Sequence, residues 1–228
     1  MHRVRRALPL AALMLVPVQS AVAAPPKPPP KPKPAPKPVT QVGIGVDPAT
    51  ITYGDGATVA GQLKGNAAGK PLVLRGAPFP FQAFADVAQG ATGSNGRYSM
   101  RVAPPITMRY QVISTTPPGA GSGIVQLTVR QRVEAAVSDT SPRHGQRVRF
   151  SGAVGPGHPG AVAYVQRRVP STGRFRTVKR THLLDAGLTR SVFSADVRIR
   201  HTGLYAVRVR GTANNAPGYS RLIAIHVH

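Results

Sequence analysis

The sequence predicts an all-β protein made of two related antiparallel β-sandwiches in tandem. Short apolar segments are separated by turns that contain glycine and proline. Apolar and polar residues alternate with a period of two within these segments, and the second half of the chain repeats the spacing of the first. Outside the N-terminus, no stretch carries a sustained helical period.

The internal repeat consists of residues that recur at a nearly constant offset. At an offset of 91, Gly54 matches Gly145 and Gly61 matches Gly152. The offset grows to 95 and then to 98 further along, as expected if the second copy has a few more loop residues. A repeat of this length is a whole domain, longer than the solenoid units of roughly 20–50 residues. The other matched pairs are Leu74 with Val165, Phe84 with Phe175, Val87 with Val178, Tyr98 with Phe193, Tyr110 with Tyr205, Val112 with Val207, and Val125, Leu127 and Val129 with Ile223, Ile225 and Val227.

The strands of the second copy show the clearest alternation. Val148 and Phe150 point to one side of a predicted strand, and Arg147 and Arg149 point to the other. Such alternation predicts one buried and one solvated face, hence antiparallel sheets packed in pairs. About seven short strands per roughly 90 residues, with turns every 8–12 residues, fit an immunoglobulin-like sandwich. Strands predicted in the first copy lie at 57–59, 72–74, 98–102, 110–113 and 124–129.

One tyrosine opens the penultimate strand of each copy, Tyr110 in the first and Tyr205 in the second. Tyr110 follows Tyr98 by 12 residues, and Tyr205 follows Phe193 by the same distance. This position favours a corner tyrosine whose hydroxyl bonds the nearby backbone, and an ordinary half-buried aromatic is the alternative. Either role concerns folding and not catalysis.

The N-terminus has the pattern of a secretory signal. Three arginines precede the short apolar stretch Ala7–Val18, and Ala21-Val22-Ala23 forms a cleavage signal, so we expect residues 1–23 to be removed near Ala23. The stretch is too short to span a bilayer, so no transmembrane segment is expected. Residues 24–39 alternate proline and lysine and predict an extended linker, either a spacer that touches an anionic layer or one without a partner. The sandwiches are then expected at 40–131 and 132–228.

Composition and motifs argue against an enzyme. Cysteine is absent, which excludes disulfides and thiol chemistry. The sequence has no nucleophile-elbow, phosphate-loop or zinc-protease motif and a single glutamate, Glu134, whereas glycosidases usually use two carboxylates. His226 and His228 share a strand face but lack a third ligand, so no metal, cofactor or small-molecule substrate is expected.

Two segments resemble a known family. The first copy runs from Pro48 to Gly61 with Ile51-Thr52-Tyr53-Gly54, and later has Gly96-Arg97-Tyr98-Ser99. The second has the corresponding run from Gly145 to Gly152 and Gly203-Leu204-Tyr205. These motifs are similar to immunoglobulin-like domains of secreted actinobacterial proteins. The resemblance covers most of residues 42–228 and implies the fold, without implying catalytic or binding residues.

Charge is the feature that points to a partner. The whole chain has a formal net charge of +23. Residues 132–228 hold 16 lysines and arginines against four carboxylates, and all but one of the basic residues are arginine. A field of this sign attracts polyanions, and arginine forms bidentate bonds to phosphate and carboxylate. An arginine-rich composition that only solvates the sheet is the alternative. The predicted polyanion-binding residues are Arg147, Arg149, Arg167, Arg168, Arg174, Arg176, Arg198, Arg200, Arg208 and Arg210.

We expect these arginines to divide between two faces. Arg147, Arg149, Arg198 and Arg200 are expected on the outer face of one sheet. Arg208 and Arg210 are expected on the opposite sheet, near Arg167 or Arg168 and near Arg174 or Arg176. The sequence thus predicts a secreted or envelope-associated, non-catalytic binding or spacer protein that contacts an anionic wall polymer. The alternative is a protein–protein adhesion module that uses a sheet edge or the loop Ala77–Phe81, in which Phe79 and Phe81 alternate with prolines.

Overall fold

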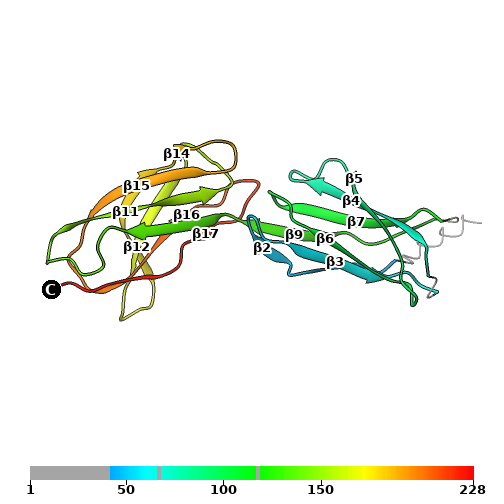
Figure 1. Cartoon of the computed structure of the whole chain (residues 1–228), viewed down its shortest axis with the longest axis horizontal. Helices are drawn as coiled ribbons and strands as arrows, with labels where there is room; N and C mark the ends of the chain where they lie inside the picture. Colours follow the sequence, from blue (N-terminus) through cyan, green and yellow to red (C-terminus); the bar gives the residue numbers. More distant parts are fainter. Residues whose placement is uncertain (1–41, 66–67, 117–118) are drawn as a thin grey trace, which may run out of the picture. The chain divides into compact units, whose positions relative to one another are not determined.

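The computed structural model describes residues 42–65, 68–116 and 119–228. The predicted signal segment and the proline- and lysine-rich linker lie outside these residues. The described part belongs to one compact unit of the chain, and it contains strands and turns without any helix (Figure 1). The prediction of an all-β fold of antiparallel sheets is confirmed.

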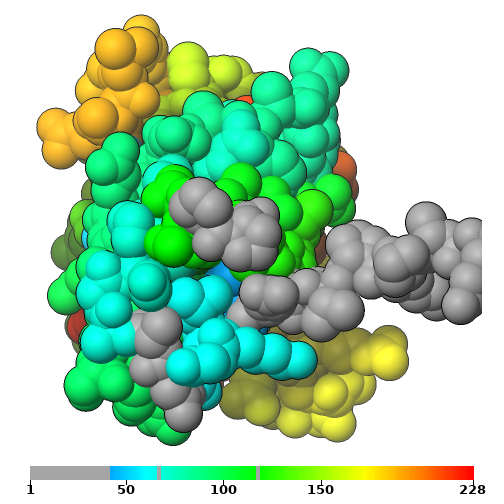
Figure 2. Space-filling model, turned by 90° about the vertical axis from the view of Figure 1, so that its right-hand side faces the viewer, coloured from blue at the N-terminus to red at the C-terminus, as the bar shows by residue number. Residues whose placement is uncertain are grey.

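The first half, up to Arg130, contains two sheets. Its smaller sheet has the order β1-β3-β6 and its larger sheet the order β2-β9-β7-β4-β5, with β8 also paired to β7. All pairs are antiparallel except β2 with β9. Figure 2 shows the surface of this half from the side that lies to the right in Figure 1. The strands are β1 (Gly45–Asp47), β2 (Thr50–Thr52), β3 (Ala57–Gln62), β4 (Pro71–Pro78), β5 (Ala85–Ala91), β6 (Arg97–Val102), β7 (Met108–Ser114), β8 (Ala120–Gly121) and β9 (Val125–Arg130).

The second half begins with β10 and also contains two sheets. One has the order β10-β11-β15-β14, and the other has the order β13-β12-β16-β17, with β18 also paired to β16. This is the strand order A-B-E-D and C-F-G of immunoglobulin domains, with one further strand beside C. The strands are β10 (Arg132–Val137), β11 (Arg147–Gly155), β12 (Val162–Arg168), β13 (Phe175–His182), β14 (Leu184–Asp185), β15 (Ser191–Arg198), β16 (Gly203–Val209), β17 (Gly218–Tyr219) and β18 (Ile223–Ile225).

Each half has its own hydrophobic core between its two sheets. The core of the first half is drawn from residues 42–129 and that of the second from residues 133–225. Phe150 and Val207 are fully buried and Tyr205 is nearly so, which confirms the predicted inward faces of β11 and β16. The rings of Phe150 and Tyr205 lie 6.0 Å apart between the sheets.

The strand registers reproduce the sequence repeat. In the first half Leu74 pairs with Val112, Tyr110 with Val125 and Met108 with Leu127. Their counterparts pair in the same way, Val165 with Val207, Tyr205 with Ile223 and Gly203 with Ile225. A bulge follows Leu74 in one copy and Val165 in the other. The two halves therefore share strand register as well as the spacing of their matched residues.

The matched glycines Gly61 and Gly152 lie where two strands approach closely. A Cβ atom on Gly61 would clash with the carbonyl of Gly43, and one on Gly152 would clash with the carbonyl of Glu134. Each glycine also faces the ring of its cross-strand partner, Tyr98 or Phe193. The repeat therefore preserves glycine because only hydrogen fits between these backbones.

The corner-tyrosine prediction is correct for one copy only. The Tyr205 hydroxyl donates to the carbonyl of His201 over 2.8 Å, as predicted. The Tyr110 hydroxyl instead contacts the sulfur of Met108 at 3.5 Å, so the prediction is wrong for Tyr110. Burial raises the pKa of the Tyr110 phenol to about 12. Met108 fills the site where the second copy has Gly203, which explains the different partner.

Gly152→Ala is expected to lower the free energy of unfolding by about 3 kcal/mol, because a methyl group there forces β10 away from β11. Gly61→Ala should cause a similar loss in the first half. Gly123→Ala is the matched control, since no atom lies within 4 Å of its added Cβ. Urea unfolding measures all three, and a Gly152→Ala midpoint equal to that of Gly123→Ala would contradict the close approach.

Candidate functional site

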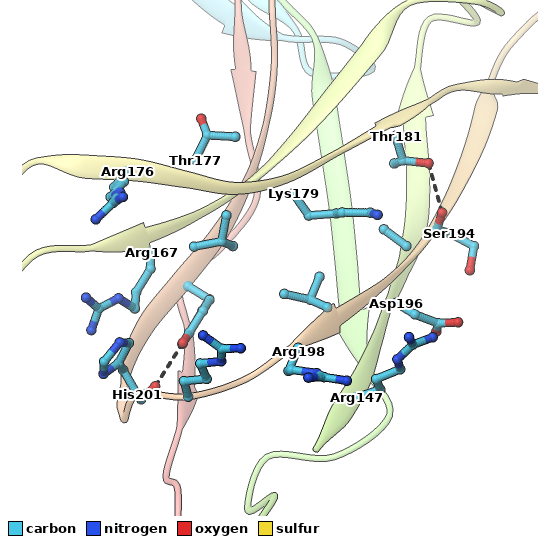
Figure 3. A pocket seen from close by; sticks show the side chains of 15 residues that line it. Arg147, Arg167, Arg176, Thr177, Lys179, Thr181, Ser194, Asp196, Arg198 and His201 are labelled. Atoms are coloured by element: carbon cyan, nitrogen blue, oxygen red, sulfur yellow. Dashed lines mark hydrogen bonds between the residues drawn. The ribbon is translucent and has the colours of Figure 1, made fainter. Parts of the chain in front are cut away.

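A groove opens along the edge of the second half where β14 is too short to close it. β14 pairs only with Ser191 and Val192 of β15, so β15 has no strand partner on that side beyond Val192 within the described residues. β13 lies beside this free edge, and the Thr181 hydroxyl donates to the Ser194 carbonyl over 2.9 Å. From this contact the two strands diverge and leave a groove of about 860 Å³ (Figure 3).

The groove is lined mainly by positively charged side chains. Six lysines and arginines contribute to it, together with His201, and Asp196 is the only carboxylate in its lining. Three hydroxyl groups lie among them, and Tyr205 and a few apolar side chains complete the walls. The basic residues are Arg147, Arg167, Arg176, Lys179, Arg198 and Arg200, and the hydroxyl-bearing residues are Thr177, Thr181 and Ser194.

Four of the arginines form two directly opposed pairs. Arg147 pairs in register with Arg198 across β11 and β15. Arg167 pairs with Arg176 across β12 and β13, in the other sheet. Cβ atoms of such partners lie about 4.5–5.5 Å apart, and like charges at this position are destabilising. None of the four takes part in an ion pair among the described residues. A bound anion would remove the repulsion in each pair.

Asp196 has a partner next to the groove. Nε of Arg149 donates to its Oδ1 over 3.0 Å. This hydrogen bond is the main reason that the Asp196 pKa lies below its ordinary value. Desolvation opposes it as the second-largest effect, and the charges of Arg149, Arg147 and Lys179 each lower the pKa further. The ion pair is complete above the ordinary carboxyl pKa of about 3.9 and is lost as the pH falls through the lowered value.

The predicted arginines divide differently from the sequence-based expectation. Arg167 and Arg176 lie on the opposite sheet, as one of the expected alternatives has it. They share the groove with Arg147, Arg198 and Arg200, however, and Arg208 and Arg210 do not line it, so their expected grouping with Arg208 and Arg210 is wrong. The two sheets meet at the open edge, and side chains from both point into the same space (Figure 3). Arg149 lies on the predicted face, and its guanidinium forms an ion pair with Asp196.

Four predicted arginines lie away from the groove. Arg168 and Arg174 are exposed at the β12–β13 turn, where Nε of Arg168 donates to the Gly173 carbonyl over 3.3 Å. Arg208 and Arg210 lie on the outer face of the second sheet, beside tyrosines. The guanidinium of Arg208 lies 5.6 Å from the ring centre of Tyr219.

Sequence reasoning missed several groove residues. Thr181 and Ser194 carried no signal in the sequence, because hydroxyl residues are common on any strand. Lys179 was missed as well. The pairing of Arg167 with Arg176 could have been found from the hairpin that joins β12 to β13, by counting back from its turn. The bulge after Val165 shifts the register beyond it, so Lys179 could not have been placed in this way.

The phenylalanine loop of the first half is partly exposed. The rings of Phe79 and Phe81 meet edge to face at 5.4 Å, and the Arg109 guanidinium lies 4.2 Å from the centre of the Phe81 ring. Phe79 is 36% exposed, and neither ring belongs to the hydrophobic core. Ala77, at the start of the loop, is fully buried, so the exposed part begins after it.

Neither a metal cluster nor a spanning helix occurs in the described part of the chain. No three histidine or carboxylate side chains gather there as ligands for a metal ion. Among the same residues there is also no helix with the length and hydropathy needed to cross a membrane.

Comparison with known proteins assigns the chain to no family. No protein-family model matches the chain, and no curated protein matches it. One solved structure that is similar is a transglutaminase of red sea bream, with 12% identity and a TM-score of 0.40. The match covers 83% of this chain and 32% of the transglutaminase, so this chain spans about a third of that protein's length.

Asp196→Asn is expected to tighten binding of inorganic polyphosphate by about threefold or more, because it removes the only carboxylate of the groove lining and releases Arg149. Asp185→Asn is the control with the same change in charge. Asp185 belongs to the short strand β14, its carboxylate accepts a hydrogen bond from the amide of Gly187, and it does not line the groove. Fluorescence titration at low salt measures both variants. Equal affinities for the two would contradict a role of Asp196 in the groove.

Proposed function

We propose that this chain is a non-catalytic binding or spacer protein that contacts an anionic polymer through the groove between β13 and β15. The polymer carries repeated phosphate or carboxylate groups, as an anionic cell-wall polymer does. The observation that carries the proposal is the pair of opposed arginine pairs, Arg147 with Arg198 and Arg167 with Arg176, on two walls of one groove. Without a bound anion, the two guanidinium groups of each pair repel each other. Each guanidinium can also donate two parallel hydrogen bonds to one anionic group.

The arrangement favours a polymer over a small anion. The two arginine pairs belong to different sheets, so each pair is expected to bind its own anionic group. A chain with several negative groups engages both pairs at once, and the second contact is then intramolecular and strengthened by its high effective concentration. The hydroxyl groups of Thr177 and Ser194 add neutral donors to the same walls, whereas that of Thr181 donates to the Ser194 carbonyl.

The predicted location agrees with such a ligand. The N-terminal signal pattern and the proline- and lysine-rich linker of the sequence suit a protein that is exported and held at, or released from, the cell envelope. The sequence also lacks the residue patterns of common hydrolases, so binding and not catalysis is proposed.

Replacing either arginine pair by glutamine should weaken binding of purified teichoic acid or inorganic polyphosphate. We expect Arg147→Gln with Arg198→Gln, or Arg167→Gln with Arg176→Gln, to lower the affinity about tenfold at low salt. Each double variant should also reduce the slope of log K against log salt by about one to two, since two phosphate contacts are lost. Titrations over a range of salt concentrations give both quantities.

The charge-matched control is Arg97→Gln with Arg101→Gln. Both arginines are exposed on β6 in the first half, so the variant has the same net charge as the groove variants. It should keep the parent slope. If this control loses as much affinity as the groove variants, the binding depends on net charge and not on the groove.

A second candidate function is adhesion to another protein through the loop that ends at Phe81. The exposed ring of Phe79 favours it, because this ring lies outside the core and next to prolines that limit the loop's freedom before binding. Adhesion could also use a sheet edge, because the unpaired edge of β15 can pair with a strand of another protein.

Phe79→Ser is expected to leave the unfolding midpoint nearly unchanged, because the ring is not part of the core. Under the adhesion function it should abolish capture of a partner from solubilised envelope protein, while the variant Val87→Ser, also exposed at 47% in the same sheet, should not. Equal capture by the parent and Phe79→Ser would exclude the loop as the contact.

A further inference from the structure

A row of alternating arginines and tyrosines crosses the outer face of the second sheet. Arg180 of β13 pairs in register with Tyr164 of β12. Tyr164 pairs on its other side with Arg208 of β16, and Arg208 pairs with Tyr219 of β17. Four neighbouring strands thus place a cation, an aromatic ring, a cation and an aromatic ring in one line.

The arginines of this row lie over the tyrosine rings. The guanidinium of Arg180 is 5.6 Å from the centre of the Tyr164 ring, and that of Arg210 is 5.1 Å from the same ring. The guanidinium of Arg208 is 5.6 Å from the centre of the Tyr219 ring. These are the distances of cation–π contacts, in which the ring attracts the cation through its negative face.

The row faces away from the core. Tyr164 lies between Ala163 and Val165, which are fully buried, so its side chain points to the opposite side of the sheet. Arg208 likewise lies between the buried Val207 and Val209. The row is therefore separate from the core side of this sheet.

It is also separate from the groove. Lys179 pairs with the buried Val165 and lines the groove, whereas the next residue, Arg180, pairs with Tyr164. Alternation along β13 therefore sends these two cations to opposite sides of the strand. No residue of the row lines the groove.

The row carries positive charge without compensation. The four strands β12, β13, β16 and β17 contain no aspartate or glutamate, and no ion pair in the described residues involves the row's arginines. A tyrosine ring under a guanidinium fixes its position but leaves the in-plane N–H donors free. Less conformational freedom is then lost when an anion binds, so these arginines are prepared to accept one.

We propose that this face is a second binding surface and that it takes an acidic polysaccharide with one carboxylate per disaccharide. Arg180 and Arg208 are separated by one strand, hence by about 9.6 Å across the sheet. That spacing is close to the length of one disaccharide, so successive carboxylates meet successive guanidinium groups. The ring of Tyr219 is 55% exposed and offers an apolar surface to the C–H face of a sugar ring.

A nucleic acid fits the row less well. Each strand of a duplex carries one phosphate per about 3.4 Å of helix axis, so most phosphates would find no guanidinium partner in a row whose cations stand about 9.6 Å apart. The proposal is independent of the groove, because the two surfaces share no side chain.

The test uses the full chain and a hyaluronan decasaccharide, in which glucuronate alternates with a neutral sugar. Arg180→Gln with Arg208→Gln should weaken binding about tenfold or more, since two charge-assisted contacts are lost. Tyr164→Leu should weaken it several-fold at constant charge, and Tyr164→Phe, which keeps the ring, should not. Arg97→Gln with Arg101→Gln, two exposed arginines of β6 in the first half, serves as the charge-matched control and should bind as the parent does.

Arg180→Lys with Arg208→Lys keeps the charge and does not depend on replacing a partly buried ring. It should lose several-fold in affinity, because lysine cannot make the planar contact with ring and carboxylate together. Calorimetric titration measures all variants, with a neutral chitin oligosaccharide and an oligothymidylate of equal length as competing probes. Parent-like affinity of the lysine variant, equal loss in the Arg97→Gln with Arg101→Gln control, or tighter binding of the oligothymidylate would each overturn the proposal.

Discussion

The pairing of β11 with β15 is the constraint on which the second half depends. Large buried residues of the two strands face each other, as Val148 faces Val197 and Phe150 faces Ala195. The period of two then requires that the residues between them also face each other on the solvent side. Arg147 must lie opposite Arg198 once Val148 lies opposite Val197. The core and the charged wall of the groove are thus two consequences of one register.

This register has an energetic cost that the sequence relieves only in part. Like charges near 5 Å in water repel by about 1 kcal/mol or less, and exposed pairs are screened by salt. At Arg149 the chain places Asp196 opposite and converts repulsion into an ion pair. At Arg147 it does not, although the same solution would fit. An anion bound between Arg147 and Arg198 would supply the opposite charge that this position lacks.

The fold could be predicted from sequence because alternation and repetition report on burial directly. Phe150, Tyr205 and the closing strand were placed correctly, since their environment is fixed by neighbours in the same strand. The groove could not, because it results from the shortness of β14 and from the meeting of two sheets at their edge. No local pattern encodes how far apart β13 and β15 diverge. The Tyr110 error has a similar cause, since its hydroxyl partner depends on Met108, which the second copy replaces by a glycine.

The edge strand β13 connects the two proposed surfaces. Arg176 and Lys179 line the groove, Arg180 lies over Tyr164 on the outer face, and none of the eight residues of β13 is a carboxylate. Exposed edge strands invite unwanted pairing with other chains, and natural proteins oppose this with charge, especially lysine and arginine. The charge of β13 can therefore serve protection and binding together. Protection requires only that cations be present along the edge. It does not require that Arg180 lie over Tyr164, or that Arg176 oppose Arg167 across a groove, and these placements are what binding adds.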